Sequence, residues 1–476
     1  MNVHDAPAPT RRGGVAAAIA GLRALLGDRL STAAAVRDQH GKDVTYHPGY
    51  PPDAVAFPRT TEEVAEIVRV CAAHGMPMIA YGTGTSLEGH IAALEGGVSI
   101  DLGGMDAVLE VNAEDLDARV EAGVTRTALN ARLRDSGLFF PIDPGADASL
   151  GGMTATRASG TNAVRYGTMR ENVLGLTVVT ADGRVVHTGG RARKSSAGYD
   201  LTRLFVGSEG TLGIITEVQL RLQGIPEAIA AAVCSFDDLA GAVDSVITTI
   251  QSGVPIARIE LLDELQMRAC NAHSKLDYPE RPTLFFEFHG SESGVAEQSR
   301  TVAGITADFG GSEFRWATRP EERTKLWAAR HNAYWACQGL RPGAVTWATD
   351  VCVPISRLAE CVLETKRDIE AEALLAPVVG HVGDGNFHLT FLLDPDDPAE
   401  FARAEGVSDR MVARALRLGG TCTGEHGIGW GKMRYLAAEH AEGIELMQRI
   451  KRAFDPENLF NPGKIVPFDP GPGPGA

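Results

Sequence analysis

Residues 378–393 read VVGHVGDGNFHLTFLL, two apolar stretches joined by Asp384-Gly385, a pattern that predicts a β-hairpin with a two-residue turn. In that hairpin His381 and His388 are directly opposite, with their Cβ atoms about 5 Å apart. Two imidazoles at this separation can bind one divalent metal, which then needs anionic partners and keeps open positions. The alternative is a pair of ordinary hydrogen-bonded histidines on a half-buried hairpin.

The chain has 476 residues, which suggests two or three domains with enough length to bury their cores. Its 61 acidic and 45 basic residues give a formal charge of −16, which argues against nucleic acid as a partner. No stretch approaches the roughly eighteen apolar residues of a membrane span, so we expect no transmembrane segment. A homodimer is left open by these properties.

The seven cysteines are scattered and form no CxxC pair. This pattern argues for a reducing compartment and against a disulfide scaffold, a zinc knuckle or an iron–sulfur cluster. We therefore expect a cytoplasmic protein, with peripheral attachment to a membrane as an alternative. Any electrons that it handles must pass to a separate acceptor.

The pattern of predicted strands and helices divides the chain into three parts. Residues 1–224 alternate short strands and helices and are rich in glycine, whereas residues 225–418 read as an α+β domain with an antiparallel sheet. Residues 419–476 carry several glycines, a helix near 440–454 and the ending DPENLFNPGK before a low-complexity tail.

Three glycine-rich segments are candidates for a cofactor site. Residues 81–89, YGTGTSLEG, follow a predicted strand, and successive amides there can form a nest for an anion. The segment is neither a Rossmann fingerprint nor a Walker A loop, and by itself an ordinary tight turn explains it. Residues 141–176 and 207–213 are similarly rich in small residues, which suits close approach of the backbone to a large flat ligand.

Taken together, these three segments resemble the FAD-linked oxidases of the vanillyl-alcohol oxidase / p-cresol methylhydroxylase (VAO/PCMH) fold. Within them the chain is most similar to the flavin-dependent D-lactate dehydrogenases and their relatives, D-2-hydroxyglutarate dehydrogenase and the glycolate oxidase D subunit. The resemblance covers residues 48–464. It implies an α+β fold in which a split FAD domain, residues 1–224 with a C-terminal return at 419–476, flanks a ferredoxin-like substrate domain at 225–418.

The resemblance also implies which residues line FAD. The first glycine-rich loop would hold the pyrophosphate, and Asn461 would lie near the flavin ring. We identify no candidate for a covalent link, interpret His90 as structural, and expect non-covalent FAD. The residues assigned to the cofactor are Gly82, Thr83, Gly84, Thr85, Ser86, Leu87, Pro144, Gly145, Ser149, Gly152, Ser159, Gly160, Tyr166, Glu209, Gly210, Ile215 and Asn461.

The same resemblance assigns His381 and His388 to a divalent metal, zinc or manganese, and adds Glu425 as the third ligand. Without the family resemblance, we would interpret Glu425 as a surface carboxylate. A 2-hydroxy acid could chelate such a metal, which would lower the pKa of its hydroxyl group. His426 would take the hydroxyl proton while the Cα hydrogen leaves as hydride. A carbanion route, in which His426 removes the Cα proton, uses the same residues.

Arg330 lies on a helix face that is otherwise apolar, so it needs an anion. The resemblance places a substrate carboxylate there, and a structural salt bridge to a glutamate is the alternative. Where the hydroxyglutarate enzymes carry a substrate lysine, this chain has Ala348, which favours a short acid. Thr390 is a further residue that we expect to face the site.

We therefore expect an FAD- and metal-dependent D-2-hydroxyacid dehydrogenase that converts D-lactate to pyruvate. Its electron acceptor would be a cytochrome, a quinone or an electron-transfer flavoprotein. Within the class, glycolate or D-2-hydroxyglutarate is the alternative substrate. Outside the class, the alternatives are a metallohydrolase, which would be colourless, and a non-catalytic flavin subunit, which no 2-hydroxy acid would reduce.

Overall fold

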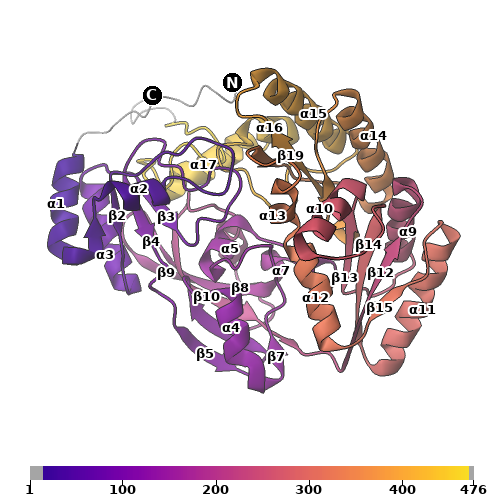
Figure 1. The fold of residues 1–476 in the computed structure, drawn as a ribbon. Helices are drawn as coiled ribbons and strands as arrows, with labels where there is room; N and C mark the ends of the chain where they lie inside the picture. Colours follow the sequence, from indigo (N-terminus) through magenta and orange to yellow (C-terminus); the bar gives the residue numbers. More distant parts are fainter. Residues whose placement is uncertain (1–13, 471–476) are drawn as a thin grey trace. The chain divides into compact units, whose positions relative to one another are not determined.

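The computed structural model describes residues 14–470, which form two compact units. Within that range the first unit contains residues 14–158, 168–224 and 425–470, and the second contains residues 159–167 and 225–424. Figure 1 shows both units as ribbons coloured along the chain. None of the helices in residues 14–470 combines the length and the apolar character that crossing a membrane requires.

A four-stranded sheet in the first unit has the order β1-β2-β4-β3, with β2 and β3 parallel to β4. Helices α1 and α3 pack against it (Figure 1), and their apolar stripes form one core with the strands. Thr60 caps α3, because its hydroxyl group accepts a hydrogen bond from the Glu63 amide at 3.2 Å. The strands are β1 (Leu30–Ser31), β2 (Ala54–Ala56), β3 (Met78–Tyr81) and β4 (Val98–Asp101).

The second sheet of this unit is antiparallel and five-stranded, in the order β5-β6-β10-β8-β9. Its core face packs with helices α4 and α5, and Ile450 and Phe454 of α17 also lie against this core. A two-stranded pair joins β7 (Leu138–Phe139) to β11 (Gln223–Gly224). The five strands are β5 (Val108–Asn112), β6 (Asp117–Glu121), β8 (Val173–Val179), β9 (Val185–Gly189) and β10 (Ile214–Arg221). The helices of the unit are α1 (Val15–Leu26), α2 (Ala34–His40), α3 (Thr61–Ala73), α4 (Arg126–Leu133), α5 (Leu150–Thr156), α7 (Met169–Asn172), α8 (Leu201–Phe205), α16 (Met433–Glu439) and α17 (Ile444–Phe454).

The second unit is built on one antiparallel sheet in the order β15-β12-β14-β13-β18-β19-β16, with β17 paired to β19. Every residue of β19 is buried, so both faces of the sheet are covered there. The strands are β12 (Ala228–Ser235), β13 (Arg258–Leu262), β14 (Thr283–Gly290), β15 (Arg315–Ala317), β16 (Val345–Ala348), β17 (Val351–Cys352), β18 (Val378–Gly380) and β19 (Asn386–Leu393). The helices are α6 (Ala163–Tyr166), α9 (Leu239–Gln251), α10 (Glu264–Ser274), α11 (Glu292–Asp308), α12 (Pro320–His331), α13 (Ala333–Gln338), α14 (Leu358–Ala371) and α15 (Pro398–Arg417).

The predicted hairpin exists as β18 and β19, but its predicted turn and register are wrong. His388 pairs with Val379 rather than with His381, and a 3₁₀ turn at Val382–Asp384 lengthens the connection. Val382 is fully buried, so the connection folds inward to remove this side chain from water instead of closing a two-residue turn. The register differs from the predicted one by two residues, and this shift leaves both histidines on the same face.

Candidate metal centre and cofactor site

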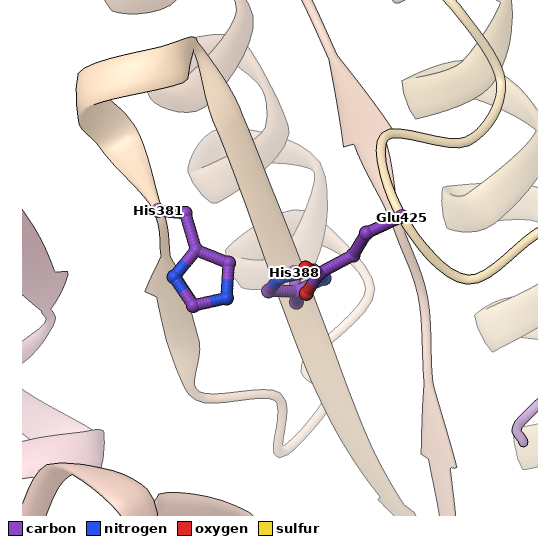
Figure 2. Close-up of side chains that lie close together, drawn as sticks. All are labelled: His381, His388 and Glu425. Atoms are coloured by element: carbon purple, nitrogen blue, oxygen red, sulfur yellow. The ribbon is translucent and has the colours of Figure 1, made fainter. Parts of the chain in front are cut away.

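His381, His388 and Glu425 come together as the sequence predicts. One potential ligand atom from each lies within 4.8 Å of the other two, and Figure 2 shows the three side chains converging. The two imidazole rings are 5.6 Å apart between centroids and nearly perpendicular, at 82°. His388 projects from β19, whereas His381 lies in the connection just after β18. Two imidazoles and one carboxylate are a donor set that suits zinc and leaves positions open.

The chain that leads to Glu425 is held close to β19. A Cβ atom on Gly424 would lie 2.2 Å from the Asn386 amide nitrogen, so only glycine allows this approach. Asn386 donates to Asp350 at 2.6 Å, and the Thr423 hydroxyl group donates to the other oxygen of the same carboxylate at 2.7 Å. Asp350 is fully buried and therefore ties the segment before Glu425 to the strand that carries His388.

Each candidate ligand imidazole has a hydrogen-bond partner at Nδ1 that fixes its tautomer. His381 Nδ1 lies 2.9 Å from both carboxylate oxygens of Glu260, and His388 Nδ1 lies 3.0 Å from the backbone carbonyl of Thr349. Both partners accept a hydrogen bond, so Nδ1 carries the proton and Nε2 is the nitrogen that can bind a metal. A second hydrogen-bonding shell of this kind is typical of metal-ligating histidines.

Arg330 makes a buried salt bridge, which is the alternative that the sequence left open. Its Nε and Nη2 lie 2.9 and 2.6 Å from one oxygen of Glu260. Ala348 of β16 pairs with Thr390 of β19, and Thr390 is buried.

His426, in the first unit, has a buried carboxylate beside it. Its Nδ1 lies 3.5 Å from a carboxylate oxygen of Glu88, and Lys432 Nζ lies 3.1 Å from the same oxygen. Burial opposes ionisation of Glu88, but Lys432 and His426 outweigh it and lower the pKa of Glu88. His426 follows the candidate ligand Glu425 directly in the chain.

Several predicted cofactor residues of the first unit also lie together. A Cβ atom on Gly82 would be 2.3 Å from the Ser149 hydroxyl group and 3.9 Å from the Gly152 Cα atom, so these residues form one cradle. The loop 82–87 is accessible, although Tyr81 and Glu88 on either side are buried. Gly145 has open space on its Cβ side, and Pro144 is half-buried. The members of this loop are Gly82, Thr83, Gly84, Thr85, Ser86 and Leu87.

A second group of predicted cofactor residues is organised around Glu209. The Asn461 amide donates to the Glu209 carbonyl at 2.8 Å, while the Glu209 carboxylate accepts hydrogen bonds from the amides of Ile428 and Gly429. Next to them, the buried hydroxyl group of Ser208 has no hydrogen-bond partner within residues 14–470. An accessible loop, a glycine cradle and an unsatisfied buried hydroxyl group fit the binding of a polar cofactor.

The remaining predicted cofactor residues are placed differently. The Ile215 side chain is buried in the core of the five-stranded sheet. Ser159, Gly160 and Tyr166 belong to the second unit, where the Tyr166 hydroxyl group lies 2.7 Å from His289 Nδ1.

Two family models match the chain, the FAD binding domain over residues 52–189 and the C-terminal domain of FAD linked oxidases over residues 225–465. The second model covers half of the chain, and the chain therefore belongs to the FAD-linked oxidases. It is an FAD-linked oxidoreductase with a VAO/PCMH-type fold. A crystal structure of p-cresol methylhydroxylase with substrate bound matches this fold with a TM-score of 0.76 at 18% identity, covering 97% of this chain and 98% of that one.

Two curated relatives are much more similar in sequence. A probable mitochondrial D-lactate dehydrogenase of Danio rerio is 53% identical, over 94% of this chain and 91% of the relative. A mitochondrial D-lactate dehydrogenase (cytochrome) of Arabidopsis thaliana is 48% identical, over 94% and 80%. Because these relatives are mitochondrial, the prediction of a cytoplasmic location is wrong. The scattered thiols that suggested it report on the absence of disulfides and do not identify a compartment.

Three residues that support the candidate ligands were not predicted from the sequence: Glu260, Asp350 and Asn386. Glu260 could have been suspected, because RIELL places a carboxylate inside an apolar strand where it must find a partner. Asp350 and Asn386 carry no such signal, since their roles arise only when β17, β19 and the segment before Glu425 are brought together.

Proposed function

We propose that this FAD-linked oxidoreductase converts D-lactate to pyruvate with the help of a divalent metal, zinc or manganese, held by His381, His388 and Glu425. The convergence of these three side chains is the observation that carries the metal part of the proposal. The substrate part is supported by the two D-lactate dehydrogenases that share about half of their residues with this chain.

The chemistry divides between the bound groups and the chain. When bound, FAD supplies a two-electron acceptor, and a divalent metal supplies a Lewis acid for the hydroxyl group and carboxylate of a 2-hydroxy acid. His426 receives the hydroxyl proton, and Glu88 beside it supports the imidazole. Arg330 binds the substrate carboxylate through Nη1, because Nε and Nη2 are engaged by Glu260.

The residues around Ala348 support a short substrate. Ala348 and its partner Thr390 present no cation, so a second carboxylate at the far end of a diacid would be left unpaired. This disfavours D-2-hydroxyglutarate and is neutral between D-lactate and glycolate. We propose a cytochrome as the external acceptor, because the Arabidopsis relative is a cytochrome-dependent enzyme.

One anaerobic experiment tests the proposal. Purified protein is mixed with D-lactate, L-lactate, glycolate or D-2-hydroxyglutarate, and bleaching of the yellow flavin is followed. We expect the fastest bleaching with D-lactate. Faster bleaching with another acid would overturn the substrate assignment, and no bleaching with any acid would indicate a non-catalytic flavin subunit. Reoxidation by cytochrome c, a quinone analogue or an electron-transfer flavoprotein then tests the acceptor.

The metal is tested by chelation and by replacing one ligand. Chelator-treated protein and His388→Ala should retain FAD but be reduced slowly, and Zn²⁺ or Mn²⁺ should restore only the chelated wild-type protein. His273→Ala provides a matched control, because this histidine lies on α10 and outside the cluster. Full activity in metal-free protein would remove the metal from the reaction.

A further inference from the structure

Strand β13 places a carboxylate in the interior of the second unit. The Glu260 side chain is only 1% exposed, and its neighbours Ile259 and Leu261 are also buried. A buried carboxylate is costly unless it is paired and hydrogen-bonded. The partners of Glu260 therefore indicate why this position carries a charge.

Glu260 contacts two residues that the proposed function uses in different ways. Its Oε2 accepts from Arg330 at 2.9 Å through Nε and at 2.6 Å through Nη2. His381 Nδ1 lies 2.9 Å from Oε1 and 2.9 Å from Oε2. The Glu260 carboxylate thus contacts both His381, a candidate metal ligand, and Arg330, the candidate residue for binding the substrate carboxylate.

The two candidate imidazole ligands differ in this respect. His388 Nδ1 lies 3.0 Å from the neutral carbonyl of Thr349, with the Asp350 carboxylate farther away at 3.5 Å, whereas His381 Nδ1 lies 2.9 Å from both oxygens of Glu260. A carboxylate partner increases the basicity of a ligating imidazole more than a carbonyl does, and it fixes the ring orientation. A change at residue 260 therefore acts on His381 and Arg330 while leaving the support of His388 intact.

We propose that Glu260 is a positioning residue that couples metal binding to substrate binding. Its carboxylate orients His381 toward the metal and, through Oε2, holds Arg330 so that Nη1 is presented to the carboxylate of the substrate. This inference rests on the proposed function, because it requires both a metal and a 2-hydroxy acid at this site.

The decisive variant is Glu260→Gln, which preserves shape and removes the charge. We expect affinity for Zn²⁺, measured by competition with a chromogenic chelator, to fall roughly ten- to hundred-fold. We also expect KM for D-lactate to stay raised when metal is saturating, because Arg330 has lost its anchor. A loss of metal affinity alone would be erased by saturating metal.

Glu287→Gln is the matched control. Glu287 is a buried carboxylate on the neighbouring strand β14, where it lies 2.8 Å from His289 Nε2 and does not contact His381 or Arg330. This variant should bind Zn²⁺ with wild-type affinity. Glu260→Asp keeps the charge on a shorter side chain and should recover part of both properties, so it tests the inference even if Glu260→Gln fails to fold.

The outcomes separate the two proposals. Wild-type protein that binds no Zn²⁺ would contradict the metal part of the proposed function. Wild-type Zn²⁺ affinity in Glu260→Gln, or equal loss in Glu287→Gln, would overturn the positioning role. Weakened metal binding with a normal KM at saturating metal would overturn the coupling while leaving the metal site in place.

Discussion

Glu260 in the second unit and Lys464 in the first are almost equally buried, at 1% and 3% exposure, yet only Glu260 has an ion-pair partner. Lys464 Nζ donates to the carbonyl of Ala92 at 2.7 Å and to the side-chain oxygen of Asn461 at 3.2 Å, and forms no ion pair within residues 14–470. Burial lowers the pKa of Lys464 to about 7, against the opposing effects of Glu209, Asp43 and Glu95.

Lys451, in the same unit, shows that a buried lysine there can be paired. It donates to the Asp455 carboxylate at 2.6 Å and to the carbonyls of Thr211 and Phe460, each at 2.8 Å. Incomplete pairing is therefore a property of the Lys464 position and not of the unit. A paired cluster should be most sensitive to the loss of one partner, whereas an unpaired charge should be most sensitive to pH.

The largest effect is expected when the paired cluster is broken. Arg330→Met leaves Glu260 buried without its cation, and this should lower the free energy of unfolding by about 3–5 kcal/mol. The measurement is denaturant unfolding followed by circular dichroism. Lys325→Met, at an exposed position of the same helix α12, should change stability by less than about 0.5 kcal/mol. Similar losses in the two variants would show that the pairing of Glu260 is not what stabilises this cluster.

Features that depend on local spacing along the chain could be predicted from the sequence. The histidine pair was predictable because side chains alternate between the two faces of a strand. The observed register differs from the predicted one by two residues, and a shift by an even number leaves both histidines on the same face. The convergence of Glu425 was predicted from the family resemblance, since the 36 residues between it and His388 fix no distance. The α+β class and the FAD-binding fold were likewise predictable from long motifs.

Pairing partners were not predictable, because they depend on contacts between distant strands and helices. Glu260 and Arg330 are 70 residues apart, and only the packing of β13 against α12 decides whether Arg330 meets a glutamate, a substrate or both. The placement of Ile215 depends on packing in the same way: its side chain lies in the core of the five-stranded sheet, and its assignment to the cofactor stays a prediction.

Lys464→Met sharpens the comparison through pH. Between pH 7 and 10.5 the unfolded chain keeps the Lys464 proton that the folded protein has lost, so wild-type stability should rise with pH in that window. The rise is at most about 1.4 kcal/mol per pH unit. The variant lacks it, so the stability of wild type relative to Lys464→Met should increase by about 2–3 kcal/mol from pH 7 to pH 9. Unfolding curves at pH 7, 8 and 9 measure this difference.

Lys42→Met, at an exposed position of the first unit, is the control for Lys464→Met and should follow the wild-type dependence on pH. If the Lys464→Met difference stays constant with pH, the amine is not a buried base whose proton is lost near neutrality. The FAD content of each sample is recorded as well, because Lys464 contacts the predicted cofactor residue Asn461.

The smallest effect is expected at His47, a second buried group of the first unit. Burial lowers the pKa of His47 to about 4, Glu88 opposes this shift, and Arg434 and His90 add to it. Below pH 6.5 His47 takes up a proton in the unfolded chain but stays neutral in the folded protein. Its contribution to the free energy of unfolding is therefore lost as the pH falls toward 4. His47→Phe keeps a ring against Trp430, whose centroid lies 4.3 Å away, and removes the titration. Between pH 6.5 and 5 wild type should lose about 2 kcal/mol relative to this variant in urea unfolding, and parallel losses would assign the acid sensitivity to other groups.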